Sequence, residues 1–122
     1  MRVLSVASEC VPFVKTGGLA DVVGALPRVM GGQGVDMRVL LPGYPKVMAA
    51  LGQTREVMED RTLFGGPGRV LSGRAEGIDL LVLEADHLYG RDGTPYLDAD
   101  GEDCTLSGEV CNYHHLISFA LP

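Results

Sequence analysis

The residues best suited to chemistry lie between positions 8 and 21, in the string SECVPFVKTGGLAD. Lys15 is followed by Gly17 and Gly18, and an apolar pattern of helical spacing begins at Leu19. Because glycine has no Cβ, an anion can approach its backbone N–H groups closely, and a helix start adds unpaired N–H donors and the positive end of a dipole. The lysine adds a positive charge that can reach a phosphate oxygen. This segment therefore predicts a phosphate-binding site.

The same residues also have a simpler explanation. A lysine in a surface loop before a glycine turn is often just solvated. The best-known phosphate motifs are also missing, because the chain contains no GxxxxGK[ST] loop and the glycine spacing here is not GxGxxG. From the residues alone, a phosphate site and an ordinary solvated loop both stay open.

The elements that must position this loop are a strand, a helix and a second strand. Residues 2–8 form a short apolar run that suits a buried parallel strand, and residues 36–42 form a second such run. A helix is predicted between them, so the three elements make a βαβ unit. Ligands of open α/β sheets collect at the carboxyl ends of strands, which is where this loop lies.

The predicted helix carries one apolar stripe, which we expect to pack against the sheet. Its members recur at helical spacing: Leu19, Val22, Val23, Leu26, Val29 and Met30. Pro27 cannot donate a backbone hydrogen bond, so a kink is expected there. The glycines at positions 31, 32 and 34 are expected to end the helix.

Past Pro45, which opens a short helix through residue 51, the pattern favours strands. Residues 70–75 and 78–83 flank Glu76 and Gly77, which predicts a hairpin. The run 78–83 is the most apolar in the chain and is expected to be a central strand. Because the sequence offers few helices to cover the sheet, we also expect this strand to keep a bare apolar face and the isolated chain either to self-associate or to behave as a partly folded species.

Composition and charge exclude several classes of protein. The net charge is −6 and the pI about 4.9, whereas nucleic-acid binding depends on clustered Lys and Arg. No apolar run reaches the length of a membrane span. The three cysteines form no paired framework, and the chain opens on a strand and not on a basic and then apolar leader. A chain of 122 residues predicts a single α/β domain in the cytoplasm, with no nucleic-acid or membrane partner.

Three strings resemble one enzyme family. SECVPFVKTGGLADVVGALP, from Ser8, resembles the N-terminal signature of bacterial and plant glycogen and starch synthases, which are ADP-glucose-dependent glucosyltransferases. GVDMRVLLPGYP at 34–45 and HLYGRDGTPY at 87–96 resemble further segments of that family, in its usual order. The resemblance covers residues 1–103, as part of an N-terminal catalytic domain, whereas residues 104–122 form a tail that does not match.

The resemblance implies a fold and a reaction. The expected fold class is α/β, with a Rossmann-like parallel sheet that makes an incomplete N-terminal domain of a two-domain GT-B glycosyltransferase. In that family the donor, ADP-glucose, lies between the two domains. Glucose passes to the non-reducing end of an α-1,4-glucan such as glycogen, with retention at the anomeric carbon and without a metal or another cofactor.

Carried over to this chain, the resemblance puts Lys15 beside the donor's diphosphate, with Gly17 and Gly18 allowing close backbone approach. Asp21 is expected to contact the donor or its sugar hydroxyls. A carboxylate in the first turn of a helix is also favourable by about 0.3–1 kcal/mol, which explains Asp21 equally well. Glu9, at the end of the first strand, is interpreted as an ordinary loop acid.

Residues 87–103 are rich in Gly, Asp, Pro and Tyr and are expected to form an exposed loop. Tyr89 and Tyr96 could stack on the sugar faces of a glucan there, although ordinary ring packing explains a tyrosine as well. We assign no catalytic residue. The family's essential histidine lies further along its N-terminal domain, and its arginine, lysine and glutamate belong to the second domain. His87 does not match that histidine, so this chain is expected to be inactive alone.

The tail allows other interpretations. Cys104, Cys111, His114 and His115 are all potential zinc ligands, but their spacing lacks the usual knuckle, and a shifted reading frame explains the loss of pattern better. We therefore predict no metal site. The alternative function is a non-catalytic α/β module that binds an anion or serves regulation, and the oligomeric state stays open.

Overall fold

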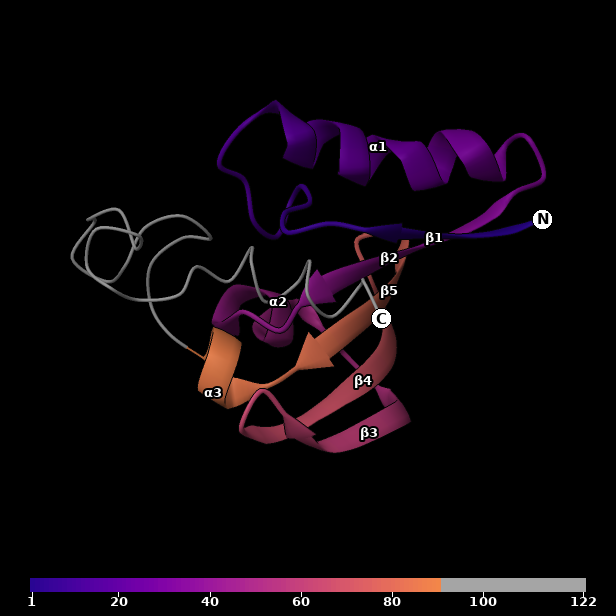
Figure 1. Ribbon diagram of the computed structural model, residues 1–122. Helices are drawn as coiled ribbons and strands as arrows, with labels where there is room; N and C mark the ends of the chain where they lie inside the picture. Colours follow the sequence, from indigo (N-terminus) through magenta and orange to yellow (C-terminus); the bar gives the residue numbers. More distant parts are fainter. Residues whose placement is uncertain (91–122) are drawn as a thin grey trace.

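The computed structural model describes residues 1–90 of the chain. They form five strands and three helices (Figure 1). In chain order these are β1 (Arg2–Val6), α1 (Gly18–Gly31), β2 (Asp36–Pro42), α2 (Pro45–Ala50), β3 (Arg55–Leu63), β4 (Gly66–Ala75), β5 (Ile78–Glu84) and α3 (Asp86–Tyr89). The predicted βαβ unit is confirmed in β1, α1 and β2, and so is the short helix that Pro45 opens.

The strands make one mixed sheet in the order β1-β2-β5-β4-β3. β1 pairs with β2 and β2 with β5 in parallel, so that Val6 lies opposite Leu40 and Leu41 opposite Val82. β4 pairs antiparallel with both β5 and β3. The predicted Rossmann-like α/β class is confirmed, and its parallel part is β1, β2 and β5.

The two antiparallel connections are tight turns with positive φ at both central residues. Glu76 and Gly77 have φ of 51° and 77° between β4 and β5, which confirms the predicted hairpin. Phe64 and Gly65 have φ of 46° and 86° between β3 and β4. This backbone matches the type I′ turn, whose twist suits paired strands. Glycine at the second position avoids the strain that a Cβ causes there.

β5 is the central strand of the described sheet, as its composition predicted. Ile78, Leu80, Val82 and Leu83 are all buried. The expectation that this strand keeps a bare apolar face is therefore wrong. Both edges of β5 are paired, and side chains from β2, β4 and α2 belong to the same core.

α1 begins and ends where the sequence predicted, and it continues through Pro27. It lies along one side of the sheet, where it contacts β2 and β5 (Figure 1). The predicted packing stripe is largely wrong, because only Ala20 and Val23 are buried in this helix. Four members of the predicted stripe are exposed: Leu19, Val22, Leu26 and Val29.

Small residues explain how α1 packs. A Cβ at Gly24 would lie 2.6 Å from the carbonyl oxygen of Val11, so glycine lets the helix approach the preceding loop. Ala20, with no exposed surface, lies on the same side one turn earlier. Apolar periodicity located the helix but did not reveal that its small residues face inward.

The segment after β5 also differs from expectation. Residues 87–89 belong to α3 and not to an exposed loop. Tyr89 is fully buried, and its ring meets that of Tyr44 edge to face, with 5.8 Å between the centroids. The rest of the predicted loop, 91–103, lies outside the described residues, as do Tyr96 and the tail with Cys104, Cys111, His114 and His115.

Candidate functional site

The predicted phosphate loop lies at the carboxyl end of β1. We call residues 7–17, which join β1 to α1, the Lys15 loop. Lys15, Gly17 and Gly18 are exposed there, and Gly17 is the N-cap residue of α1. Gly17 has no side chain that could accept a hydrogen bond, so the N–H groups of the first turn of α1 have no side-chain cap from this residue. The structure thus confirms that the lysine and the glycines meet at a helix start.

The fold itself does not require glycine at positions 17 and 18. Gly17 has φ of −166°, which is extended backbone that any residue adopts, and neither glycine is among those with positive φ. A Cβ at either position would meet no atom within 4 Å. The space beside both residues is therefore open, as an approaching anion needs.

Lys15 and Asp21 form an ion pair that the sequence did not predict. The lysine Nζ lies 2.7 Å from Asp21 Oδ2, and both side chains are 54% exposed. An ion pair this exposed contributes about 0–1 kcal/mol. Lys15 can therefore leave Asp21 for another anion at little cost.

The first half of the Lys15 loop is held by its own backbone. Cys10 and Val14 exchange two hydrogen bonds, with N···O distances of 2.9 and 3.0 Å. Val11 N–H donates to the carbonyl of Ala20, at 3.0 Å, and so joins the loop to the first turns of α1. Cys10 and Phe13 are buried beneath this turn. Cys10 and Phe13 therefore anchor the loop in the core, although Pro12 between them is exposed.

Glu9 is the residue that sequence reasoning undervalued. Its side chain is buried, with 2% of the residue exposed, whereas an ordinary loop acid would be solvated. Its Oε2 accepts a hydrogen bond from the backbone N–H of Thr16, at 2.9 Å, and another from the Thr16 hydroxyl. The only signal in the sequence is that Glu9 stands between an apolar run and Cys10. That signal gives no hint of the contact with Thr16.

Other buried polar groups near the site do not supply reactive chemistry. Burial raises the pKa of the Cys10 thiol to about 11, so the thiol stays neutral near pH 7. Ser8 Oγ is buried without a hydrogen-bond partner among the described residues. Tyr89 is buried too, which confirms ring packing over stacking on a glucan. His87 Nε2 lies 2.7 Å from the carbonyl oxygen of Leu63, to which the ring can donate a hydrogen bond.

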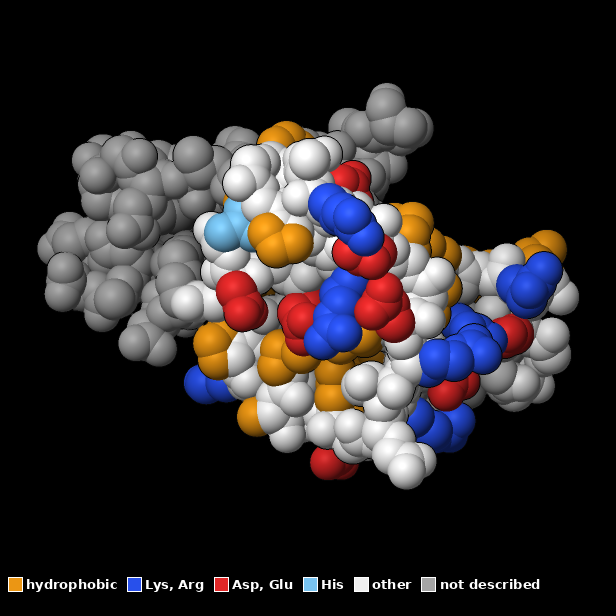
Figure 2. All heavy atoms as spheres, turned by 90° about the horizontal axis from the view of Figure 1, so that it is seen from below, with side chains coloured by type: hydrophobic (Ala, Val, Ile, Leu, Met, Phe, Trp, Pro, Cys, Tyr) orange, Lys and Arg blue, Asp and Glu red, His pale blue; other side chains and the backbone are white. Residues whose placement is uncertain are grey.

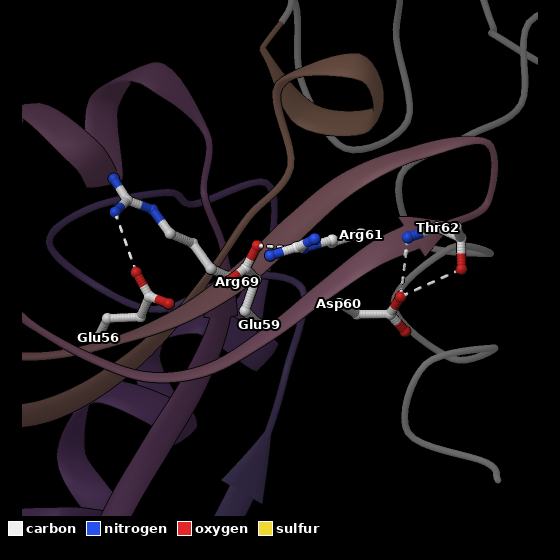
Figure 3. Close-up of polar contacts among 6 residues, drawn as sticks. All are labelled: Glu56, Glu59, Asp60, Arg61, Thr62 and Arg69. Carbon is white, nitrogen blue, oxygen red and sulfur yellow. Dashed lines mark hydrogen bonds and ion pairs between the residues drawn. The ribbon is translucent and has the colours of Figure 1, made fainter.

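A hollow of about 490 Å³ lies on the antiparallel side of the sheet, near β3, β4 and α3. Acidic and basic side chains gather on this face (Figure 2). Arg69 pairs there with Glu84 at 2.6 Å and with Glu56 at 3.4 Å, and Figure 3 shows the second of these pairs. Further acids in the lining are Glu59 and Asp86. An anion would meet these carboxylates, so the hollow is a poor phosphate site.

Two further kinds of site are absent from residues 1–90. No helix in this part of the chain is long and apolar enough to cross a membrane. Its His, Cys, Asp and Glu side chains form no group of three or more that could hold a metal ion. The Lys15 loop is thus the best candidate site in the described structure.

Known proteins are similar to this chain over a range that includes the Lys15 loop. A family model described as the starch synthase catalytic domain matches residues 2–112. Glycogen synthase 2 of Bradyrhizobium diazoefficiens is 55% identical over 107 residues, which are 88% of this chain and 22% of that protein. Glycogen synthase of Paracoccus denitrificans is 59% identical over 102 residues, or 84% of this chain and 22% of that protein.

A solved structure agrees. The catalytic domain of starch synthase IV from Arabidopsis thaliana, bound to ADP and acarbose, matches with a TM-score of 0.54 and 25% identity. The match covers 68% of this chain and 18% of the other. This chain therefore spans about a fifth of the length of the relatives that it matches.

Proposed function

Since this chain belongs to the starch synthase catalytic domain family, we propose that it is the N-terminal part of an ADP-glucose-dependent glucosyltransferase. The whole enzyme transfers glucose to the non-reducing end of an α-1,4-glucan such as glycogen, with retention, in the cytoplasm. One observation supports this assignment above all. Lys15 lies at a helix start at the carboxyl end of β1, in a chain that is 55% and 59% identical to two glycogen synthases over the 107 and 102 residues matched.

The Lys15 loop binds the diphosphate of the donor in this proposal. Gly17 and Gly18 offer open backbone at the positive end of the α1 dipole, and Lys15 supplies a full charge once it leaves Asp21. A positive charge beside the diphosphate also stabilises the negative charge that grows on it as the sugar departs. Lys15 thus binds the donor and favours its cleavage.

Asp21 has a separate role. When Lys15 turns to the phosphate, the Asp21 carboxylate is released at the rim of the loop, with about half of its side chain exposed. A carboxylate accepts hydrogen bonds from hydroxyl groups. We assign it to hydroxyls of the donor, which keeps it apart from the phosphates that would repel it.

This chain alone supplies one side of the reaction. Transfer needs groups around both the leaving diphosphate and the attacking hydroxyl. This chain spans about a fifth of the length of its relatives, and we expect the remaining groups to lie outside that fifth. A donor bound to this chain alone would also be much less buried than a donor held between the two domains of the whole enzyme. We therefore expect the chain to bind ADP-glucose with a dissociation constant of about a millimolar or weaker, and to transfer no glucose.

A nuclear magnetic resonance titration with ADP-glucose tests the site. In the wild-type chain, amide signals of residues 15–20 should shift with ligand, and in Lys15→Ala these shifts should be lost. Arg61→Ala is the matched control, because it removes one positive charge from an 86% exposed side chain on β3, at the far edge of the sheet. Equal shifts in Lys15→Ala and Arg61→Ala would exclude Lys15 from the site.

A further inference from the structure

Glu9 is buried, and it has no ion-pair partner within residues 1–90. No Lys, Arg or His side chain among the described residues lies within 4.0 Å of its carboxylate, and Lys15, the nearest cation in the sequence, pairs with Asp21. Removing a carboxylate from water is unfavourable unless hydrogen bonds compensate. Glu9 has two recorded hydrogen bonds, and both come from Thr16. The cost of burying the Glu9 carboxylate is therefore offset, among the described residues, by hydrogen bonds from Thr16 alone.

Thr16 is the residue between Lys15 and Gly17. It is exposed, like its neighbours, so the segment from Lys15 to Gly17 lies over the buried Glu9 carboxylate. The backbone bonds of Cys10 and Val14 hold the loop before this segment, and the bond from Val11 to Ala20 holds the helix after it. In the part of the chain that the structure describes, the Glu9 contact is the buried bond to the backbone of the segment in between, whereas the Lys15–Asp21 ion pair joins exposed side chains.

We propose that Glu9 is a positioning residue for the diphosphate site, acting through Thr16. This inference rests on the proposed function of the Lys15 loop. By holding the Thr16 N–H and hydroxyl, the carboxylate fixes the backbone between Lys15 and Gly17 before a ligand arrives, while the Lys15 side chain stays free to exchange its partner. A preordered loop binds more tightly because binding no longer has to order it. Glu9 stays beneath the loop, so it does not itself meet the phosphates.

Three variants of the full chain test this role. Thr16→Val removes the hydroxyl donor and nearly keeps the shape, Thr16→Ser keeps both donors, and Glu9→Gln removes the charge and keeps the side-chain size. The probe is inorganic pyrophosphate, which lacks the sugar and the base. Its dissociation constant should rise about three- to tenfold in Thr16→Val and in Glu9→Gln, and stay within about twofold in Thr16→Ser.

A ligand-free measurement separates positioning from a general loss of stability. Backbone ¹⁵N order parameters should fall for residues 15–18 in Thr16→Val and Glu9→Gln, whereas those of β2 and β5 and the thermal midpoint stay close to wild type. The double variant should bind pyrophosphate no more weakly than the weaker single variant, because both substitutions weaken the same contact between Glu9 and Thr16.

Two results would overturn the inference, and they differ in what they imply. Wild-type loop order and pyrophosphate affinity in both Thr16→Val and Glu9→Gln, with binding lost in Lys15→Ala, would remove Glu9 from the site and leave the proposed function standing. Unchanged pyrophosphate binding in Lys15→Ala would overturn the proposed function, and the positioning role with it.

Discussion

Lys15 and Glu9 belong to the same loop, but Lys15 is exposed on its surface and Glu9 is buried beneath Thr16. Lys15 is exposed, and among the described residues its side chain pairs only with Asp21, in an exposed ion pair that it can exchange for another anion. Glu9 is buried and holds Thr16 in place. A mobile charge on a fixed backbone suits a ligand that arrives, reacts and leaves. At the scale of single residues, the site therefore combines one exchangeable contact with one permanent contact.

Two buried side chains with raised pKa values, the Cys10 thiol and the Tyr89 phenol, make the stability of the fold sensitive to alkaline pH. Burial raises the pKa of Cys10 from its ordinary value of 9.0 to about 11, and it raises the pKa of Tyr89 above its ordinary 10.0. Above these ordinary values the unfolded chain loses its protons while the folded chain keeps them. The free energy of unfolding therefore falls as pH rises from about 9 to about 11 and beyond.

Tyr89→Phe should reduce this alkaline loss. The Tyr89 hydroxyl is buried with no hydrogen-bond partner among the described residues, so its removal should leave stability at pH 7 unchanged or raise it by up to about 1 kcal/mol. The ring contact with Tyr44 is retained. Urea unfolding at pH 7 and at pH 10.5 measures both effects. Parallel declines in variant and wild type would mean that Tyr89 ionises equally in both states.

At the scale of elements, the close approach of α1 to the Lys15 loop depends on Gly24. A Cβ there would lie 2.6 Å from the backbone oxygen of Val11, which cannot move without shifting the loop. Gly24→Ala should therefore lower the free energy of unfolding by about 1–3 kcal/mol, although alanine favours helix by about 1 kcal/mol.

Gly31→Ala is the matched control for this helix. A Cβ at Gly31 would meet no atom within 4 Å, so the substitution should be neutral or stabilise by up to about 1 kcal/mol. Urea unfolding of both variants gives the comparison. If Gly24→Ala is as stable as Gly31→Ala, then the helix does not need glycine to pack on Val11.

The sequence predicted elements better than it predicted which faces are buried. Helical spacing, Pro45 and the pair Glu76-Gly77 are local signals, and each predicted its element correctly. Which stripe of α1 faces inward depends on contacts with a loop that is distant in space until the chain folds. The contact between Glu9 and Thr16 likewise joins residues seven positions apart through a turn, and no local propensity encodes it.

At the scale of the whole molecule, α1 carries an exposed apolar stripe in the described structure. Its members are between 37% and 61% exposed: Leu19, Val22, Leu26 and Val29. Clustered apolar side chains at this spacing form a continuous ridge on a helix, and exposed surfaces of this kind associate. This stripe replaces β5 as the reason to expect self-association of the isolated chain.

Light scattering coupled to size-exclusion chromatography tests this expectation. The wild-type chain should elute as dimers or larger species, and the double variant Val22→Lys and Val29→Lys should shift toward monomer. Val57→Lys, on the exposed edge strand β3, adds the same kind of charge at another surface and should leave association unchanged. A monomeric wild type, or relief by Val57→Lys alone, would exclude the α1 stripe as the contact.

The central claim is that the Lys15 loop forms the donor-diphosphate site of a glucosyltransferase. A chimera tests it most directly, in which residues 1–90 replace the matching segment of a glycogen synthase more than half identical to this chain. We predict glucose transfer from ADP-glucose to glycogen by the chimera, and a loss of about a hundredfold or more in kcat/KM with Lys15→Ala. Arg61→Ala should keep full activity. A folded chimera without transfer, or equal activity in Lys15→Ala and Arg61→Ala, would contradict the claim.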